Sequence, residues 1–209
     1  MSRINGKPSF VLYVEGPRDR GVLEAWARAF SPPLARALPS ITVILGGRQP
    51  ARAAGDFRER RERGGATAAL CVLDRDGRAD APPPAPEEPG LEFFTWGRRH
   101  IESYLLVPDA IRRSLRLAAD DSRIERFFRS ELPAPDDEPA LRELAAKPLF
   151  AAHGRLERLL GRRVSPGQVA RAMRSGELHG EVRDLLARLC AGLGIREAAT
   201  VVRRPLRIP

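Results

Sequence analysis

Four carboxylates stand at or just beyond the ends of two apolar segments of strand length. They are Glu15 and Asp19 after residues 9–14, and Asp74 and Asp76 after residues 68–73. Asp74 and Asp76 are separated by one residue, so in extended geometry their side chains point to the same side. Acidic oxygen ligands suit Mg²⁺ or Mn²⁺ rather than Zn²⁺, and without a cation clustered carboxylates raise each other's pKa. If the two segments meet, the spacing predicts a divalent-metal site.

The elements around these carboxylates predict an α/β fold with a mostly parallel sheet. The predicted elements are strands at 9–14, 41–45, 68–73 and 91–96, a helix at 18–30 and a charged, solvated helix at 48–63. Continuous apolar runs are typical of strands buried on both faces, and strands that alternate with helices indicate βαβ units. Open sheets of this kind hold ligands just outside the carboxyl ends of the strands, where the acids stand.

The second half of the chain predicts helices. The expected ranges are a short helix at 101–106 and helices at 109–118, 122–131, 139–160, 166–174 and 178–192. The proline-rich residues 79–90 cannot form a helix or a central strand and predict an exposed linker, and the basic tail at 203–209 predicts a loose end. We expect two parts: a catalytic domain over residues 1–107, and a helical extension over 108–209 that packs on it or continues it.

The charge balance favours a polyanionic partner. The formal net charge is +9 and the sequence pI is about 10.9, which indicates nucleic acid, DNA or RNA. All basic residues except Lys7 and Lys147 are arginines; a compositional bias of the genome explains arginine over lysine but not the excess of base over acid. No apolar run approaches the ~20 residues that span a bilayer, and the polar N-terminus does not resemble a signal peptide. With Cys71 and Cys190 in apolar contexts, these features predict a cytoplasmic protein without a disulfide framework.

The acidic motifs resemble the Toprim domain. Val14-Glu15-Gly16 with Asp19, followed by Asp74-Arg75-Asp76 after a later strand, is similar to the pattern of that domain over about residues 9–107. Toprim domains occur in type IA and II topoisomerases, bacterial primases, recombination proteins, small ribosomal-RNA maturation nucleases and OLD-family nucleases. The resemblance implies a Rossmann-like, mostly parallel sheet flanked by helices, and a metal-dependent site.

A later segment narrows the resemblance to OLD-type and small defence-associated Toprim nucleases. Residues 98–105, Arg-Arg-His-Ile-Glu-Ser-Tyr-Leu, are similar to the Arg-x-x-Glu-x-Tyr-Leu segment of those nucleases. There the glutamate completes a two-metal site and a downstream lysine assists catalysis. Glu102 matches the glutamate, and Lys147 is the one lysine after Lys7. A lysine in an arginine-rich chain suggests a need for a compact ammonium that can donate to a phosphate.

The resemblance implies a metal-dependent endonuclease, which hydrolyses phosphodiester bonds with two Mg²⁺ or Mn²⁺ ions. It implies metal ligation by Glu15, Asp19, Asp74, Asp76 and Glu102, and catalytic roles for Glu15 and Lys147. Four arginines that flank these acids in the sequence are candidate phosphate contacts: Arg98, Arg99, Arg112 and Arg113. The three histidines have no metal-ligand spacing and are more typical of surface residues, with His153 a weaker candidate for assisting Lys147.

Other interpretations stay open at this point. Asp74 to Gly77 has good turn chemistry, and Asp19 could simply begin a helix, where an acid complements the helix dipole. A ribosomal-RNA maturation nuclease is an alternative within the same superfamily. A noncatalytic nucleic-acid-binding or regulatory subunit is an alternative from a different class. No Walker motif is present, so an ATPase partner in anti-phage defence would be a separate chain.

Overall fold

The computed structural model describes residues 10–77 and 88–196. Most of the predicted linker, and the tail at 203–209, lie outside these ranges. The described residues contain a four-stranded parallel sheet in the order β2-β1-β3-β4. Its strands are β1 (Phe10–Val14), β2 (Thr42–Ile44), β3 (Ala68–Leu73) and β4 (Leu91–Thr95). The α/β class, the parallel sheet and the helical second half are confirmed.

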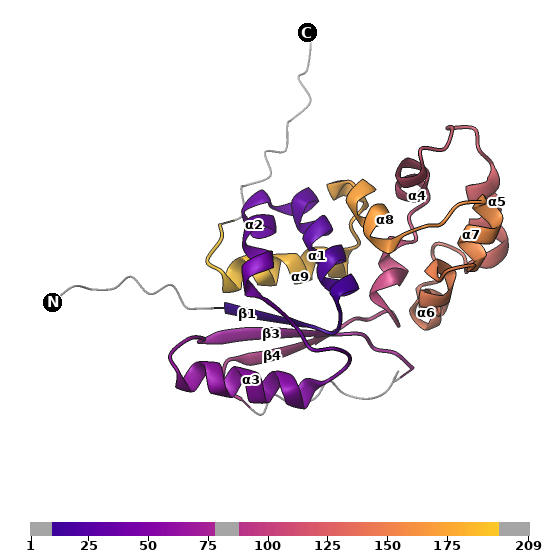
Figure 1. Ribbon diagram of the computed structural model, residues 1–209. Coiled ribbons are helices and arrows are strands. Elements are labelled where there is room, and N and C mark those ends of the chain that lie inside the picture. Colours follow the sequence, from indigo (N-terminus) through magenta and orange to yellow (C-terminus); the bar gives the residue numbers. More distant parts are fainter. Residues whose placement is uncertain (1–9, 78–87, 197–209) are drawn as a thin grey trace, which may run out of the picture.

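Helices cover both faces of the sheet (Figure 1). Alternate residues of β1 point to opposite sides: Leu12 joins the larger apolar core, whereas Tyr13 joins a smaller one. Helices α1 (Pro17–Phe30), α2 (Pro32–Ile41) and α9 (Gly180–Gly192) lie over the first face. Helix α3 (Pro50–Glu62) lies over the second. The prediction of α3 as a solvated helix was wrong in one respect, because its Phe57 is fully buried against the sheet.

Prolines set the boundaries of the first two helices. Pro17 occupies the first turn of α1, where its missing N–H costs nothing, and Ser31 is extended before Pro32, which ends α1. Pro32 then begins α2, which the sequence analysis did not predict, since a proline that stops one helix is equally suited to begin the next.

The helices of the second half gather beyond the carboxyl ends of the strands, except for α9 (Figure 1). They are η1 (Ile101–Leu105, a 3₁₀ helix), α4 (Pro108–Leu115), α5 (Arg123–Glu131), α6 (Glu138–Glu143), η2 (Lys147–Phe150, a 3₁₀ turn), α7 (Arg155–Leu160), α8 (Pro166–Ala172) and η3 (Ser175–Glu177, a 3₁₀ turn). Helix α8 packs on α1 and α4, and one apolar core includes residues from both halves of the chain. The division at residue 107 stays a prediction.

The helix predicted over 139–160 is broken, and the break positions Lys147. Helix α6 ends at Glu143, Pro148 follows Lys147 and disfavours helical geometry before it, and η2 forms instead. At Gly154 a Cβ atom would lie 2.6 Å from the carbonyl oxygen of Pro148, so the chain turns tightly there before α7. Lys147 therefore projects from a short turn rather than from a long helix.

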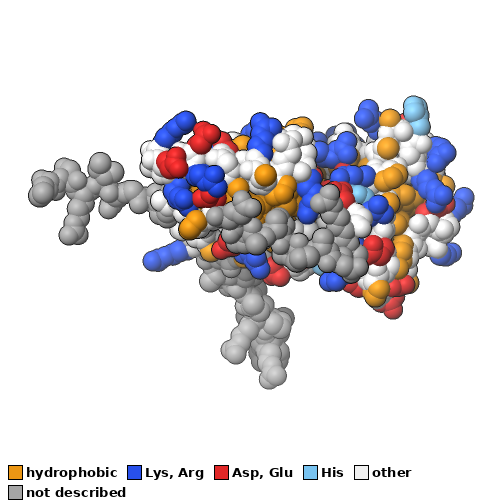
Figure 2. Space-filling view, turned by 90° about the horizontal axis from the view of Figure 1, so that it is seen from below, with side chains coloured by type: hydrophobic (Ala, Val, Ile, Leu, Met, Phe, Trp, Pro, Cys, Tyr) orange, Lys and Arg blue, Asp and Glu red, His pale blue; other side chains and the backbone are white. Residues whose placement is uncertain are grey.

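Three further observations concern the thiols, the helix lengths and the surface charges. Cys71 and Cys190 are buried thiols. Within residues 10–77 and 88–196, no helix combines the length and the apolar composition that crossing a membrane requires. Figure 2 shows basic and acidic side chains interspersed over one face, rather than one continuous basic patch. Surface charge on that face therefore does not by itself mark a nucleic-acid site.

Candidate functional site

The predicted acids meet at the carboxyl ends of the two central strands. Glu15 directly follows β1, and Asp74 directly follows β3, which pairs with β1 in parallel register. Asp19 comes from the first turn of α1 and Glu102 from η1. These four carboxylates line one open hollow together with Lys147. Residues that are more than a hundred positions apart in the sequence are thereby brought to one site.

Backbone contacts hold Glu15 and Asp74 together. The amide of Asp74 donates to Oε1 of Glu15 at 2.7 Å. Burial raises the pKa of Glu15, and the charges of Asp74 and Asp76 raise it further. On the other side, the amides of Gly46 and Gly47 donate to the carbonyl oxygen of Glu15 at 2.9 and 2.8 Å. Both glycines have positive φ, at 80° and 125°, a conformation that glycine adopts without steric cost.

Asp19 combines the two roles that the sequence left open. Its Oδ2 accepts from the amide of Gly16 at 2.7 Å, so it caps the first turn of α1. It also lines the hollow. Burial raises the pKa of Asp19 to about 7, with further contributions from the charges of Asp74 and Glu102. A carboxylate that is this difficult to ionise at neutral pH would be relieved by a nearby cation.

Glu102 is the most deeply buried acid of the site. It is 0% exposed, and its Oε1 accepts from Arg18 Nη1 at 3.1 Å. Its Oε2 has no hydrogen-bond partner among the described residues. The neighbouring amide of Ile101 donates to Oδ1 of Asp74 at 2.9 Å, which fixes η1 against the end of β3. A buried carboxylate oxygen without a hydrogen-bond partner destabilises a protein unless a bound ligand interacts with it.

Lys147 supplies a positive charge beside the acids. Its Nζ lies 2.6 Å from Oδ2 of Asp74 and 3.8 Å from Oδ1 of Asp76. Burial alone would lower the pKa of Lys147, but the hydrogen bond to Asp74 and the charges of Asp74 and Glu102 raise it overall. The side chain is therefore an ammonium at neutral pH, and it is 40% exposed, within reach of a ligand.

Asp76 and His100 are not among the residues that line the hollow, although Asp76 lies near the Lys147 ammonium. Asp76 adopts a left-handed conformation with φ of 53°, and its amide donates to the carbonyl oxygen of Arg99 at 3.0 Å. His100 is 6% exposed, so its prediction as a surface residue was wrong. Its Nε2 lies 3.8 Å from Oδ1 of Asp76. Burial and the nearby Lys147 ammonium lower the pKa of His100, so the ring is neutral at neutral pH. Its Nδ1 has no partner among the described residues.

Three of the four predicted phosphate-contacting arginines are engaged within the protein. Arg98 pairs with Glu138 at 2.8 Å, and Arg112 pairs with Asp109 at 2.7 Å and also with Glu125. Arg113 donates to the carbonyl oxygen of Ala172 at 2.9 Å and pairs with Glu177. The fourth, Arg99, has a buried Nε without a partner in the described part of the chain. The assignment of all four to phosphate stays a prediction.

Sequence reasoning missed Arg18, which lies between Glu15 and Asp19 in the chain. Its ion pair with Glu102 joins residues 84 positions apart, and no local sequence pattern predicts such a contact. The nearest indication was its place in the strand-to-helix turn that carries both acids. Arg48 was also missed: its Nη1 donates to the carbonyl oxygen of Asp74, and it anchors the end of β3 from the loop before α3.

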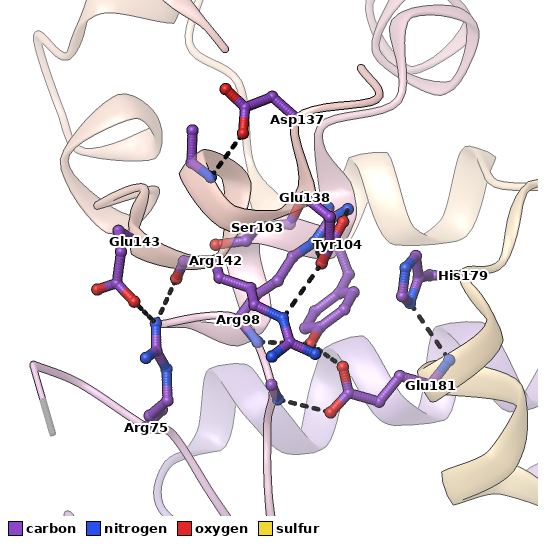
Figure 3. A network of polar contacts seen from close by, with 12 residues as sticks. Arg75, Arg98, Ser103, Tyr104, Asp137, Glu138, Arg142, Glu143, His179 and Glu181 are labelled. Atoms are coloured by element: carbon purple, nitrogen blue, oxygen red, sulfur yellow. Dashed lines mark hydrogen bonds and ion pairs between the residues drawn. The ribbon is translucent and has the colours of Figure 1, made fainter. Parts of the chain in front are cut away.

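A polar network holds the segment that carries Glu102 (Figure 3). The hydroxyl of Tyr104 donates to Glu181 of α9 and accepts from the amide of Arg98 at 2.9 Å. Glu181 also accepts from the amide of Gly97 at 2.5 Å. A Cβ atom at Gly97 would lie 3.0 Å from Glu181, so this approach is close. Burial and the hydrogen bond to Glu181 raise the pKa of Tyr104. The network ties residues 97–104 to α9, and the ion pair between Arg98 and Glu138 ties the same segment to α6.

The donor set fits a divalent cation, although the acids are not gathered into a finished metal centre. Among the described residues, no three His, Cys, Asp or Glu side chains converge closely enough to hold a metal ion. Two of the acids are neutralised from within the protein instead, Asp74 by Lys147 and Glu102 by Arg18. The oxygen-only ligands, the partnerless Oε2 of Glu102 and the raised pKa of Asp19 all favour a hard cation such as Mg²⁺ or Mn²⁺.

Comparison with known proteins finds structural similarity alone. No family model matches the sequence, and no curated protein matches it. The C-terminal region of the Burkholderia pseudomallei OLD protein is similar in structure with a TM-score of 0.48 and 16% sequence identity, over 89% of this chain and 98% of that one.

Two structures of the C-terminal region of the Xanthomonas campestris pv. campestris OLD protein give TM-scores of 0.47 and 0.48, with 16% and 15% identity. Each covers 90% of this chain, and 97% and 95% of the respective structure is covered.

Proposed function

We propose that this chain hydrolyses phosphodiester bonds of DNA or RNA with the help of Mg²⁺ or Mn²⁺, as a Toprim-type endonuclease. The observation that carries the proposal is the hollow at the carboxyl ends of β1 and β3, which Glu15, Asp19, Asp74 and Glu102 line together with the Lys147 ammonium. Carboxylates for cations and an ammonium for a phosphate are the complementary charges that phosphoryl chemistry needs. The resemblance to defence-associated nucleases extends the proposal to an anti-phage role with a separate ATPase chain.

Each residue of the site has a distinct role in this proposal. Glu15, Asp74 and Asp76 would hold one ion, and Asp19 and Glu102 would support a second. When bound, such ions polarise the phosphate and lower the pKa of a water molecule. Lys147 would turn from Asp74 towards the substrate and neutralise the negative charge that develops on the phosphate. Arg18 would leave Glu102 and so free its Oε1.

A cleavage assay tests the proposal directly. Supercoiled plasmid, single-stranded DNA and transfer RNA are each incubated with the protein in Mg²⁺, in Mn²⁺ or in chelator. We expect cleavage of at least one substrate with a divalent ion and none in chelator, because the acids cannot activate water without a cation. Cleavage that persists in chelator would reject the mechanism.

One observation favours a noncatalytic alternative. Lys147 and Arg18 already compensate Asp74 and Glu102, so the acids could serve only to organise the end of the sheet in a nucleic-acid-binding or regulatory subunit. That alternative predicts no cleavage with either ion, and unchanged nucleic-acid binding after Glu15→Ala. A ribosomal-RNA maturation nuclease would instead cleave a ribosomal-RNA precursor in preference to the other substrates.

The network around Tyr104 gives a prediction that separates positioning from stability. Tyr104→Phe removes the hydroxyl that joins Arg98 to Glu181, and we expect a loss of about 1–3 kcal/mol in unfolding free energy together with slower cleavage. Tyr13→Phe is the matched control, because Tyr13 donates to Asp56 at 2.7 Å on the α3 side of the sheet. It should lose comparable stability, measured by urea unfolding, with cleavage unchanged. Equal cleavage rates in the two variants would show that the network does not position Glu102.

A further inference from the structure

A second hollow begins where the acidic one ends. Both are lined by Pro17 and Arg18 at the start of α1. The second continues past Gly21, along Phe150 of η2, to the segment 163–168 that leads into α8. The two walls of the second hollow belong to helices that pack against each other, α1 and α8. The two hollows therefore adjoin at Pro17 and Arg18.

The two hollows have opposite chemical character. The first contains four carboxylates, whereas no acid of the described ranges lines the second. Its polar groups are the guanidinium groups of Arg18 and Arg163, the hydroxyl of Ser165 and the amide of Gln168. These groups are donors that suit phosphate oxygens. An acidic hollow that adjoins a basic one is the arrangement expected when one anionic chain crosses both, with cations bound at the acids as proposed above.

Arg163 is notable because its side chain is unused. It is exposed, and it forms no ion pair or hydrogen bond within residues 10–77 and 88–196, in contrast to Arg98, Arg112 and Arg113. Its neighbour Arg162 donates to the carbonyl oxygen of Leu115 and is thereby held away. At Gly21 a Cβ atom would meet nothing within 4 Å, so the hollow is open above α1. A guanidinium without a partner on an open, acid-free surface is available to an anion.

We infer that the second hollow binds the phosphodiester backbone of one strand of DNA or RNA next to the bond at the acidic site. Arg163 contacts a phosphate there, Gln168 and Ser165 donate to neighbouring oxygens, and Arg18 passes from Glu102 to the strand as the strand enters. This inference deepens the proposed function and rests on it for the place of the scissile bond. It assigns a substrate-binding role to residues 163–168, which none of the sequence motifs indicated.

Binding measured without metal tests the inference independently of catalysis. Fluorescently labelled DNA and RNA strands of the same sequence, longer than the ~4–16 nucleotides of a typical strand-binding site, are titrated in chelator at salt concentrations from about 50 to 200 mM. Loss of one phosphate contact lowers the slope of log K against log salt by about 0.7. For Arg163→Gln we therefore expect that decrease, with binding about fivefold weaker near 0.1 M salt.

Two further variants identify the cause of any change. Arg163→Lys retains the charge and should keep the salt slope. Arg36→Gln removes an arginine that is exposed on α2, at a position that lines neither hollow, and should leave both affinity and slope as in the unmodified protein. A comparison of the DNA and RNA titrations shows which strand supplies the phosphates.

The outcomes for the inference and for the proposed function are separable. If Arg163→Gln binds like the unmodified protein, or if Arg36→Gln has the same effect as Arg163→Gln, the inference is overturned even where metal-dependent cleavage is observed. If cleavage is never observed but Arg163→Gln alone lowers the salt slope, the strand-binding hollow stands and the proposed catalysis falls.

Discussion

Substitution of Asp74 by asparagine is expected to reduce metal-dependent cleavage by at least ~100-fold while the fold is retained. Loss of a residue that only supports a metal ligand costs up to about 100-fold, and loss of a proposed ligand should cost at least as much. Asp74 is 5% exposed. An asparagine of the same shape can still accept the hydrogen bond from the amide of Ile101, which is 2.9 Å in the native protein. It loses the negative charge that would bind a cation and that now faces Lys147. The effect should therefore fall on chemistry more than on structure.

The measurement is the cleavage rate with Mn²⁺, together with Mn²⁺ binding by calorimetry. Asp184→Asn makes the same chemical change on the exposed side of α9, outside the hollow, and should leave both quantities unchanged. An Asp74→Asn variant that cleaves at the normal rate would remove the acids from the mechanism, and the noncatalytic alternative would then be favoured.

The same variant has an electrostatic consequence inside the site. The charge of Asp74 is the second cause, after burial, that raises the pKa of Asp19 to about 7, and it also raises the pKa of Glu15. Once Asp74 is neutral, both carboxyls should ionise at lower pH. A bound cation and the asparagine substitution would thus lower the pKa of Asp19 alike, but only the cation would support the proposed catalysis.

The position of the site could be predicted from sequence because it depends on strand ends. Two apolar runs with acids directly after them sufficed to place Glu15 and Asp74, since parallel strands bring their carboxyl ends to one edge and β1 pairs with β3. Glu102 followed from a motif rather than from physical reasoning, and its complete burial was not foreseen. An acid in a short helix is usually solvated, and here tertiary packing overrides that expectation.

The contacts of the charged and polar side chains around the site could not be predicted, because they join segments that are distant in the sequence. Arg98 is predicted to contact phosphate from its place beside the motif, and that stays a prediction; its ion pair with Glu138, forty residues later, was not foreseen. His100 was expected at the surface, but it lies in the connection between β4 and η1, where it is buried next to Asp76. In an arginine-rich chain, local sequence cannot distinguish an arginine that serves the fold from one that serves a ligand. We propose Arg163 as an example of the second kind.

Replacement of Lys147 by glutamine should destabilise the metal-free protein, but it should increase the stabilisation that Mn²⁺ provides. Without metal, Asp74 loses the ammonium 2.6 Å away and remains a buried charge. We expect a loss on the order of 1–2 kcal/mol in unfolding free energy, less than for a fully buried pair because Lys147 is 40% exposed. Cleavage should fall by about 10²–10³-fold, the typical effect of removing one group that stabilises transition-state charge.

With Mn²⁺ the variant should recover stability, and should gain more from the ion than the unmodified protein does. If Asp74 holds a cation as proposed, that cation would displace Lys147 in the unmodified protein, whereas in the variant the carboxylate has no ammonium beside it. A ligand at 100 times its Kd stabilises a protein by about 2.7 kcal/mol. Tighter Mn²⁺ binding by the variant should therefore give a larger Mn²⁺-induced rise of Tm than in the unmodified protein, measured by thermal unfolding.

Lys147→Arg is the matched control for this experiment. It retains the positive charge near Asp74 and should keep most of the metal-free stability, but a planar guanidinium does not replace a compact ammonium at a phosphate, so cleavage should stay low. If Mn²⁺ raised Tm equally in all three proteins, Lys147 and the cation would not share Asp74. The ammonium would then be a structural partner of the acid, and its place in catalysis would have to be given to another cation of the site, of which Arg18 is the nearest to Glu102.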